Sequence, residues 1–191
     1  PVLIVDLPVA RLSAGFVETL LGWALWPHAG FVAPRVWTAR ERMDYGGVLF
    51  PQSDRACYAH QGWPIGTDSF QLYGYGARAL LHQRFTAVAP VVVMSRAAHL
   101  MGDCLDARYQ GRLGLLAAML GAHAAGSHNL WIPQASLSLP PGAPAGKWNV
   151  LDDRRTASGD RSHWRASVSV PQPDPCYHPR LSSRGDFSLS W

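Results

Sequence analysis

Apolar positions near the start of the chain form one run typical of a buried strand and one set spaced as in a helix. Residues 1–5 are a continuous apolar run rich in branched side chains, which predicts a strand buried on both faces. The run ends at Asp6, and an acid at the carboxyl end of a buried strand stands where α/β proteins place their ligands. Residues 13–24 carry apolar side chains at helical spacing, which predicts an amphipathic helix with Ser13 as its N-cap.

The next part of the chain mixes short apolar runs with an aromatic, glycine-rich stretch. Residues 31–37 predict a second strand that Pro34 breaks, and residues 46–50 predict a third strand that opens on a glycine pair. Residues 56–75 are aromatic, polar and rich in glycine, without periodicity, so we expect a long ordered loop there.

The second half of the chain contains the strongest strand and helix patterns. Residues 85–94 predict a strand in which Pro90 requires an edge, a bulge or a break. Residues 113–125 are rich in Leu and Ala and predict a helix, with Gly126 well placed to cap its end. Residues 129–133 predict another short strand.

Composition narrows the class of protein. A chain of 191 residues with 48% hydrophobic side chains buries roughly 70% of its unfolded surface, so one core is expected. A charged fraction of 16% argues against disorder and against a coiled coil, and no apolar stretch reaches the roughly 20 residues of a membrane span.

The charged residues and the cysteines exclude further classes. The net charge of +4 comes from scattered arginines, with Lys147 as the only lysine, which does not resemble a nucleic-acid footprint. Cys57, Cys104 and Cys176 have neither the number nor the spacing of a disulfide framework or a zinc finger, so we expect a reducing cytoplasm.

Several segments, in order, resemble the second half of a family 2 glycosyltransferase domain of the kind that builds bacterial O-antigen and rhamnan. The closing segments carry the most specific motifs, which read Gly-Ser-His-Asn-Leu-Trp-Ile-Pro and Asp-Phe-Ser-Leu here. The resemblance covers nearly the whole chain through these segments: 6–20, 45–49, 60–64, 85–96, 126–133 and 174–191.

This resemblance implies a fold and a division of the chain. The fold would be the α/β glycosyltransferase A type, with a mixed sheet, flanking helices and a loop-rich end. Residues 1–139 would form its acceptor-side half, and the Pro-, Gly- and Ser-rich residues 140–191 would form a tail that packs on it. The nucleotide-binding half would lie before residue 1, so the chain would be a fragment of a longer protein or a degenerate remnant.

The resemblance also implies an acidic chemistry that the sequence only partly retains. An inverting transferase uses strand-end carboxylates to hold Mg²⁺ or Mn²⁺ against the nucleotide diphosphate, and a separate acid to deprotonate the acceptor hydroxyl. Asp6 alone stands in the metal register, since Leu7 and Pro8 follow it, and it serves either as a ligand-facing acid or as a strand-end cap.

By the resemblance, the family's general base lies ahead of the Gly-Ser-His-Asn-Leu-Trp-Ile-Pro motif, and counting back from Asn129 leads to residues 114–117, which contain no carboxylate. Asp103 and Asp106 are the weak alternatives for that base, and the competing interpretation is a solvated turn. A further histidine of the family is replaced here by Leu139 and Pro140.

Four residues in the resembling segments are candidates for contact with an acceptor sugar. They are His60, Trp63, Arg96 and Trp131. Aromatic faces stack on the apolar face of a pyranose, while His supplies hydrogen bonds. The alternative is a packed loop for His60 and Trp63 and a core position for Trp131.

Three hypotheses follow. The first is a sugar-transfer protein, impaired or incomplete in this chain, that uses a nucleotide-sugar donor and a growing bacterial surface glycan, with a missing N-terminal half or a partner transferase. Peripheral association with a polysaccharide assembly machine fits this hypothesis. The second is a non-catalytic module on the same scaffold that binds glycan or a partner. The third is an unrelated small α/β binding protein.

Overall fold

Ten strands and two α-helices make up most of the described part of the computed structural model, which comprises residues 1–52, 55–62, 83–100, 112–143 and 169–177. The helices are α1 (Phe16–Ala24) and α3 (Arg112–Ala124), and a 3-10 turn, η2, covers Ala97–His99. The strands are β1 (Val2–Val5), β2 (Arg11–Leu12), β3 (Ala29–Trp37), β4 (Met43–Tyr45), β5 (Gly47–Gln52), β6 (Arg55–Tyr58), β7 (Gln83–Phe85), β8 (Ala87–Val88), β9 (Val92–Ser95) and β10 (His128–Ser138). The fold class is therefore α/β with a mixed sheet, which agrees with the coarse class that the resemblance implies.

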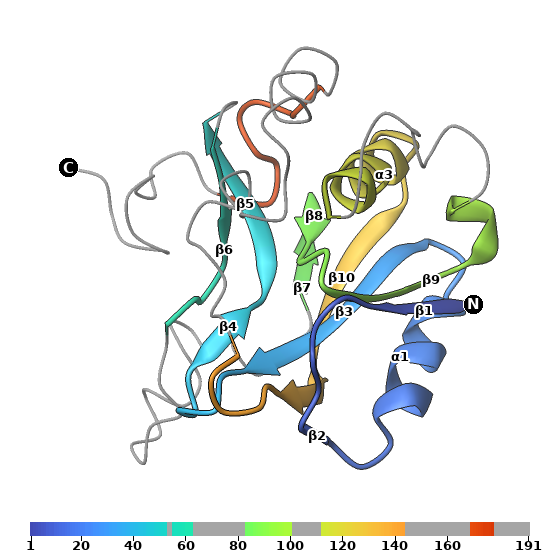
Figure 1. Ribbon diagram of the computed structural model, residues 1–191. Coiled ribbons are helices and arrows are strands. Elements are labelled where there is room, and N and C mark those ends of the chain that lie inside the picture. The colour runs from blue at the N-terminus through green and yellow to red at the C-terminus, as the bar shows by residue number, and fades with distance from the viewer. Residues whose placement is uncertain (53–54, 63–82, 101–111, 144–168, 178–191) are drawn as a thin grey trace.

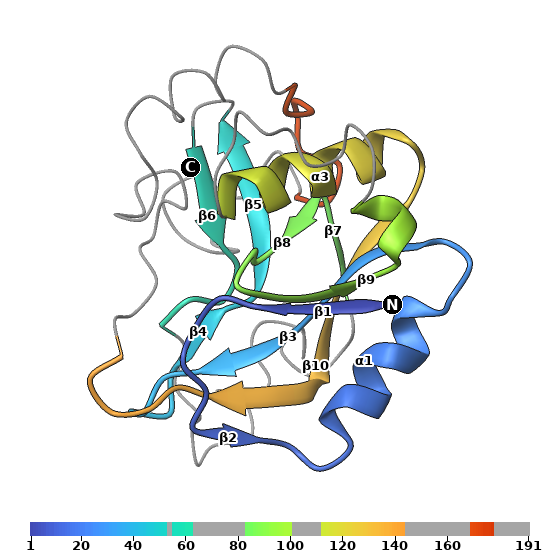
Figure 2. The same ribbon diagram turned by 45° about the vertical axis from the view of Figure 1, so that its right-hand side comes forward.

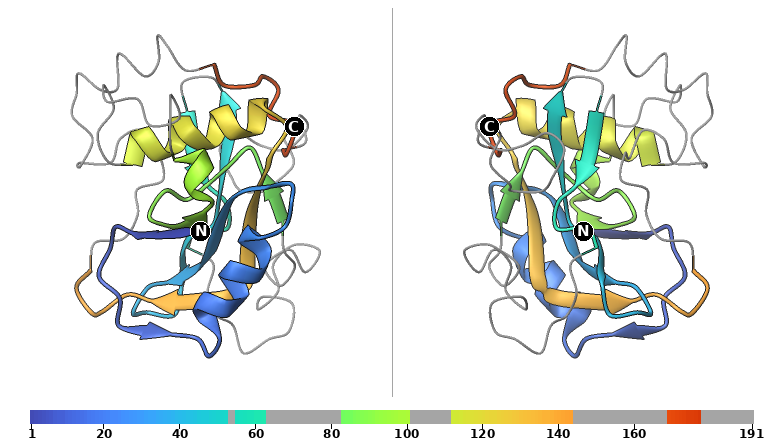
Figure 3. Two further views of the ribbon diagram at one scale, coloured as in Figure 1. Left: turned by 90° about the vertical axis from the view of Figure 1, so that its right-hand side faces the viewer. Right: turned by 90° about the vertical axis from the view of Figure 1, so that its left-hand side faces the viewer.

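The larger sheet is mixed and places three strand ends at one edge. Its main order is β1-β9-β3-β10-β2, while β4 adds to β3 and β7 adds to β10. Because β9 is antiparallel to both β1 and β3, and β3 is parallel to β10, the strands β1, β3 and β10 all point the same way. Helix α1 lies on one face of this sheet and α3 on the other (Figure 1; Figure 2). A second sheet, β6-β5-β8, stands beside α3 (Figure 3).

Strand β1 forms where expected, but it is not buried on both faces. It lies at one end of the strand order and pairs with β9 alone, so its other side has no neighbouring strand in the described part of the chain. Val2 and Val5 are accordingly exposed, while Leu3 and Ile4 are half-buried. An apolar run does not distinguish a central strand from an edge strand.

Helix α1 begins two residues later than an N-cap at Ser13 requires. Gly15 is its N-cap residue, with a left-handed φ of 64°, and no side chain caps the helix. The prediction of Ser13 as the cap was wrong because its hydroxyl has a distant partner: Ser13 Oγ accepts a hydrogen bond of 3.0 Å from the backbone N–H of Ser136 in β10.

Strand β3 is longer than predicted and runs through Pro34 without a break. Proline donates no backbone hydrogen bond, and the register of the neighbouring strand β10 shifts between Ile132, the partner of Pro34, and Ser136. This irregularity lets the sheet continue past the proline. Strand β10 also exceeds its predicted range of 129–133, since its far end pairs with β2.

The apolar segment 85–94 is divided as Pro90 required. It supplies the end of β7, then β8, then most of β9, with Pro90 in the turn before the last of these. The expected loop at 56–75 needs a correction at its start, since residues 56–58 belong to β6, which pairs antiparallel with β5. The remainder of that prediction from residue 63 onward lies outside the described residues.

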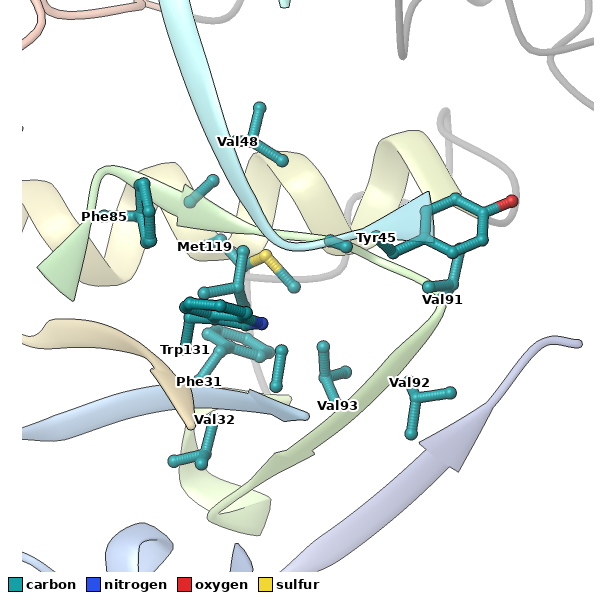
Figure 4. Packing of buried hydrophobic residues seen from close by; sticks show 14 of the residues in the cluster. Phe31, Val32, Tyr45, Val48, Phe85, Val91, Val92, Val93, Met119 and Trp131 are labelled. Atoms are coloured by element: carbon teal, nitrogen blue, oxygen red, sulfur yellow. The ribbon is translucent and has the colours of Figure 1, made fainter. Parts of the chain in front are cut away.

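Helix α3 ends as its sequence predicted. Gly126 has a left-handed φ of 88°, its N–H binds the carbonyl of His123, and the N–H of Ser127 binds the carbonyl of Ala122. This pair of bonds is a Schellman cap. Met119 points from this helix toward Trp131 and Phe31 in the buried cluster between the helix and the sheet (Figure 4).

The buried side chain of Asn129 links helix α3, strand β3 and the residue between β7 and β8 by hydrogen bonds. Its side chain is completely buried, and its Oδ1 accepts from the N–H of Phe31 at 3.1 Å. Its Nδ2 donates to the carbonyls of Thr86 and Met119 at 2.8 and 2.9 Å. All three side-chain bonds stabilise backbone groups that water does not reach.

The segment 169–177 is anchored by a buried carboxylate. Asp174 is only 5% exposed and accepts hydrogen bonds from the N–H of Phe50, the hydroxyl of Thr86 and the N–H of Cys176. Tyr177 joins the hydrophobic core. This part of the expected tail region therefore packs against residues of the first 139.

Candidate functional site

The edge where β1, β3 and β10 end contains the one strand-end acid that the sequence singled out. Asp6 directly follows β1, and its backbone N–H binds the carbonyl of Val91 at 2.7 Å. Its carboxylate Oδ2 accepts a hydrogen bond of 2.8 Å from Nε of Arg112, the first residue of α3. Nη2 of the same arginine donates to the backbone carbonyl of Asp6 at 3.1 Å. We call this edge, with Asp6 and Arg112 at its centre, the edge site.

The two partners of this ion pair are very differently exposed. The Arg112 side chain is 7% exposed and the Asp6 side chain 41% exposed, so a buried cation meets a half-accessible anion. A cation in the first turn of a helix is unfavourable toward the helix dipole, and Asp6 compensates for it. The guanidinium carbon also lies 5.9 Å from the ring centroid of Tyr45, within range of a cation–π contact. The pair is therefore close to neutral and partly withdrawn from water.

This arrangement does not fit a divalent cation. In the described residues no group of three or more His, Cys, Asp or Glu side chains is placed to hold a metal. Asp6 would contribute one carboxylate, and its Oδ2 already binds a guanidinium that a cation would have to displace. We therefore derive no chemical step through a metal at the edge site.

Two further polar groups stand in the strands that lead to this edge, and the sequence reasoning missed both. Arg35 in β3 lies with its guanidinium carbon 4.5 Å from the ring centroid of Trp37, and burial lowers the pKa of Arg35. Asp44 in β4 is 2% exposed and accepts a hydrogen bond of 3.4 Å from the amide of Gln61. A charged residue inside an otherwise apolar run was the available signal at both positions, and Arg112 shows the same signal at the start of an apolar helix.

His60 and Trp131 lie together in the interior rather than at a surface. Both are completely buried, and their ring centroids are 5.5 Å apart. His60 adopts a left-handed φ of 62° in the turn after β6. Neither side chain offers a surface on which an acceptor sugar could stack. Trp63, the third aromatic candidate, lies outside the described residues.

Arg96 lies at the opposite edge of the sheet, where it caps the end of α1. Its guanidinium donates to the carbonyls of Ala24, Leu25 and Trp26, which are the last carbonyls of α1 and the turn after it. Capping these carbonyls and opposing the helix dipole account for the arginine. The structure therefore brings none of the described acceptor candidates to the edge site.

The segment to which the resemblance assigns the general base lies within α3 and carries no carboxylate. Residues 114–117, where the resemblance located the base, are in the body of α3 rather than in the turn that opens it. Gly114, Leu115 and Leu116 are buried there. Asp103 and Asp106 precede the helix and lie outside the described residues, so their role stays a prediction.

Comparisons with known proteins give no family for this chain: no family model, no curated protein and no solved structure matches it. In the part of the chain that the structure describes, no helix is long and apolar enough to cross a membrane. Of the cysteines described there, Cys57 is buried and Cys176 is half-buried.

Proposed function

We propose that the chain is a glycosyltransferase-like protein of bacterial surface polysaccharide assembly, whose scaffold handles a nucleotide-sugar donor and a glycan acceptor and whose metal-assisted sugar transfer is impaired. The mixed sheet supports the scaffold part of this proposal. Asp6 follows the carboxyl end of β1, at the same edge as the ends of β3 and β10, which is where α/β sheets bind ligands.

The observation that carries the proposal is the ion pair between Asp6 and Arg112. A metal-dependent transferase needs a carboxylate that is available to a cation beside the diphosphate. Here the strand-end carboxylate is held 2.8 Å from a buried guanidinium, so its charge is already balanced within the protein. The impaired chemistry follows from this contact and not from the sequence departures alone.

A second candidate is a non-catalytic module on the same scaffold that binds a glycan or a partner transferase. The same ion pair favours it, since a neutral strand-end pair stabilises the fold without preparing a reaction. The two candidates differ in one property: the first retains affinity for a nucleotide diphosphate, and the second does not.

Calorimetric titration of the chain with UDP and with dTDP, each with and without Mn²⁺, tests the proposal. We expect binding of at least one nucleotide with the same affinity in both conditions, and no sugar transfer from the corresponding nucleotide sugar. The same titration of Asp6→Ala should give the same affinity. Glu18→Gln, at an exposed position of α1, is the matched control in which a different carboxylate is removed. Absence of any nucleotide binding overturns the donor part of the proposal and leaves the non-catalytic module.

A further inference from the structure

Three basic side chains contact Trp26 at the edge of the sheet opposite to the edge site, and a fourth lies near one of them. The Trp26 ring stacks with His128 at a centroid distance of 5.7 Å and meets His28 edge-on at 5.4 Å. The guanidinium carbon of Arg84 lies 5.8 Å from the centroid of the same ring. His123, in the last turn of α3, acts electrostatically on His128. We call these five residues the Trp26 cluster.

The fold holds this cluster in place through backbone pairing. The N–H of His128 binds the carbonyl of His28 at 2.8 Å, so the strand starts of β10 and β3 lie side by side. Arg84 in β7 is paired with Leu130, which places it diagonally across from His128 on the same face. Trp26 is fixed because the N–H of Ala29 binds its carbonyl. The cluster therefore comes from four separate elements and is a property of the fold.

The charges in the cluster all have one sign. Burial lowers the pKa of His128, and Arg84, His28 and His123 lower it further by repulsion. These three are the charged groups that face it within the described residues, and all of them are bases. Arg96 adds another cation near the cluster through its bond to the backbone carbonyl of Trp26. His28 and Arg84 are exposed, so the cluster is open to solvent.

We propose that the Trp26 cluster binds a dianionic phosphate group carried by a small ligand. An arginine and several imidazoles supply charge-assisted donors for the oxygens, and a dianion compensates more of this positive charge than a carboxylate does. A metal ion is not the occupant, because the described histidines are not placed as a metal group. Protonation of His128 accompanies binding, since an anion at this position favours the charged imidazole.

This site is independent of the proposed function. Continuing the strand registers across β9 puts Asp6 opposite Arg35 of β3, while His128 is paired with Ala29 of the same strand. At ~3.3 Å per residue, the stretch of β3 from Ala29 to Arg35 separates the two sites by about 20 Å. A nucleotide at the edge site would not reach the cluster with its own phosphates. Failure of one proposal therefore leaves the other standing.

Titration of the histidine imidazole signals by NMR, with and without added anion, tests the site. Sulfate serves as the first probe because it stays dianionic between pH 5 and 8, so any pH dependence belongs to the protein. We expect saturable shifts at His128 and His28, a raised pKa of His128, and affinity at least tenfold higher at pH 5.5 than at pH 7.5. Acetate, a monoanion, should bind at least tenfold more weakly.

Two variants and a matched control sharpen the experiment. Arg84→Gln should weaken sulfate binding about tenfold, and His128→Asn should reduce its pH dependence while leaving the fold intact by circular dichroism. Arg40→Gln, another exposed arginine outside the cluster, should change neither. Glucose 1-phosphate compared with inorganic phosphate at pH 8, where both are largely dianionic, distinguishes a carried phosphate, which should bind more tightly, from the free ion. Equal binding of acetate and sulfate, or unchanged binding in Arg84→Gln, overturns the proposal.

Discussion

The ion pair between Asp6 and Arg112 makes a quantitative prediction about stability. Asp6→Ala removes the 2.8 Å bond to a guanidinium whose side chain is only 7% exposed. Breaking a fully buried pair costs about 3–5 kcal/mol, but Asp6 is 41% exposed, and hydrogen bonds to charged groups are worth about 1.5–3 kcal/mol. We therefore expect Asp6→Ala to lower the free energy of unfolding by about 2 kcal/mol.

Replacing the other partner of the ion pair should lower the free energy of unfolding by less. Arg112→Met replaces the arginine with a side chain that fills most of the space of its apolar stem. The Asp6 carboxylate that remains is accessible to water and regains hydration. We expect a loss of about 1 kcal/mol. The double variant should lose about 1 kcal/mol, less than Asp6→Ala alone, because the loss in that single variant consists largely of the unbalanced buried cation, which Arg112→Met removes.

Urea denaturation followed by tryptophan fluorescence measures these three values, with the slope of the transition checked for constancy. Glu18→Ala, at an exposed position in the first turn of α1, is the control and should change the free energy of unfolding by less than about 1 kcal/mol, because it loses only the favourable interaction of an acid with the helix dipole. The reasoning is refuted if the two single effects add to within about 0.3–0.5 kcal/mol, since independent sites behave in that way.

Four further substitutions test the remaining structural claims. Asn129→Ala should cost about 3–5 kcal/mol in urea denaturation because it removes three hydrogen bonds to buried backbone groups. Asp174→Asn should cost about 2–3 kcal/mol because its amide meets N–H and O–H donors. Gly47→Ala should lower the free energy of unfolding by about 3 kcal/mol, and with it the melting temperature, because its new methyl group would collide with the ring of Phe85. The lowered pKa of His128 means that the unfolded state binds its proton more readily, so stability should be full above about pH 6.5 and fall as the pH drops through that value. His128→Asn should flatten that decline in a buffer free of phosphate and sulfate.

Local signals predicted the elements whose determinants lie close together in the chain. The end of α3 depends on Gly126, whose left-handed backbone is a property of glycine and of the two bonds around it. Pro90 interrupts the apolar run 85–94 by the same kind of local constraint. The start of α1 was missed because Ser13 Oγ binds a residue in β10, and no local pattern reports that pairing.

The candidate site depended on contacts between distant residues, and there the sequence was a poorer guide. Asp6 was singled out from its position after a strand, but its partner Arg112 is 106 residues away. Trp131 and His60 were associated with an acceptor because of their residue types, yet both are completely buried. An aromatic ring can pack in a hydrophobic core or stack on a sugar, and the residue type alone does not distinguish these two roles. The burial of the side chain in the folded structure does.

The effect of manganese on nucleotide binding by the intact chain and by Asp6→Ala tests the central claim most directly. If Arg112 occupies the strand-end carboxylate, the affinity for UDP or dTDP is the same with and without Mn²⁺, and Asp6→Ala leaves it within about twofold of the unaltered chain. Binding that requires Mn²⁺ and disappears in Asp6→Ala would show that Asp6 is available to a metal, and would contradict the account.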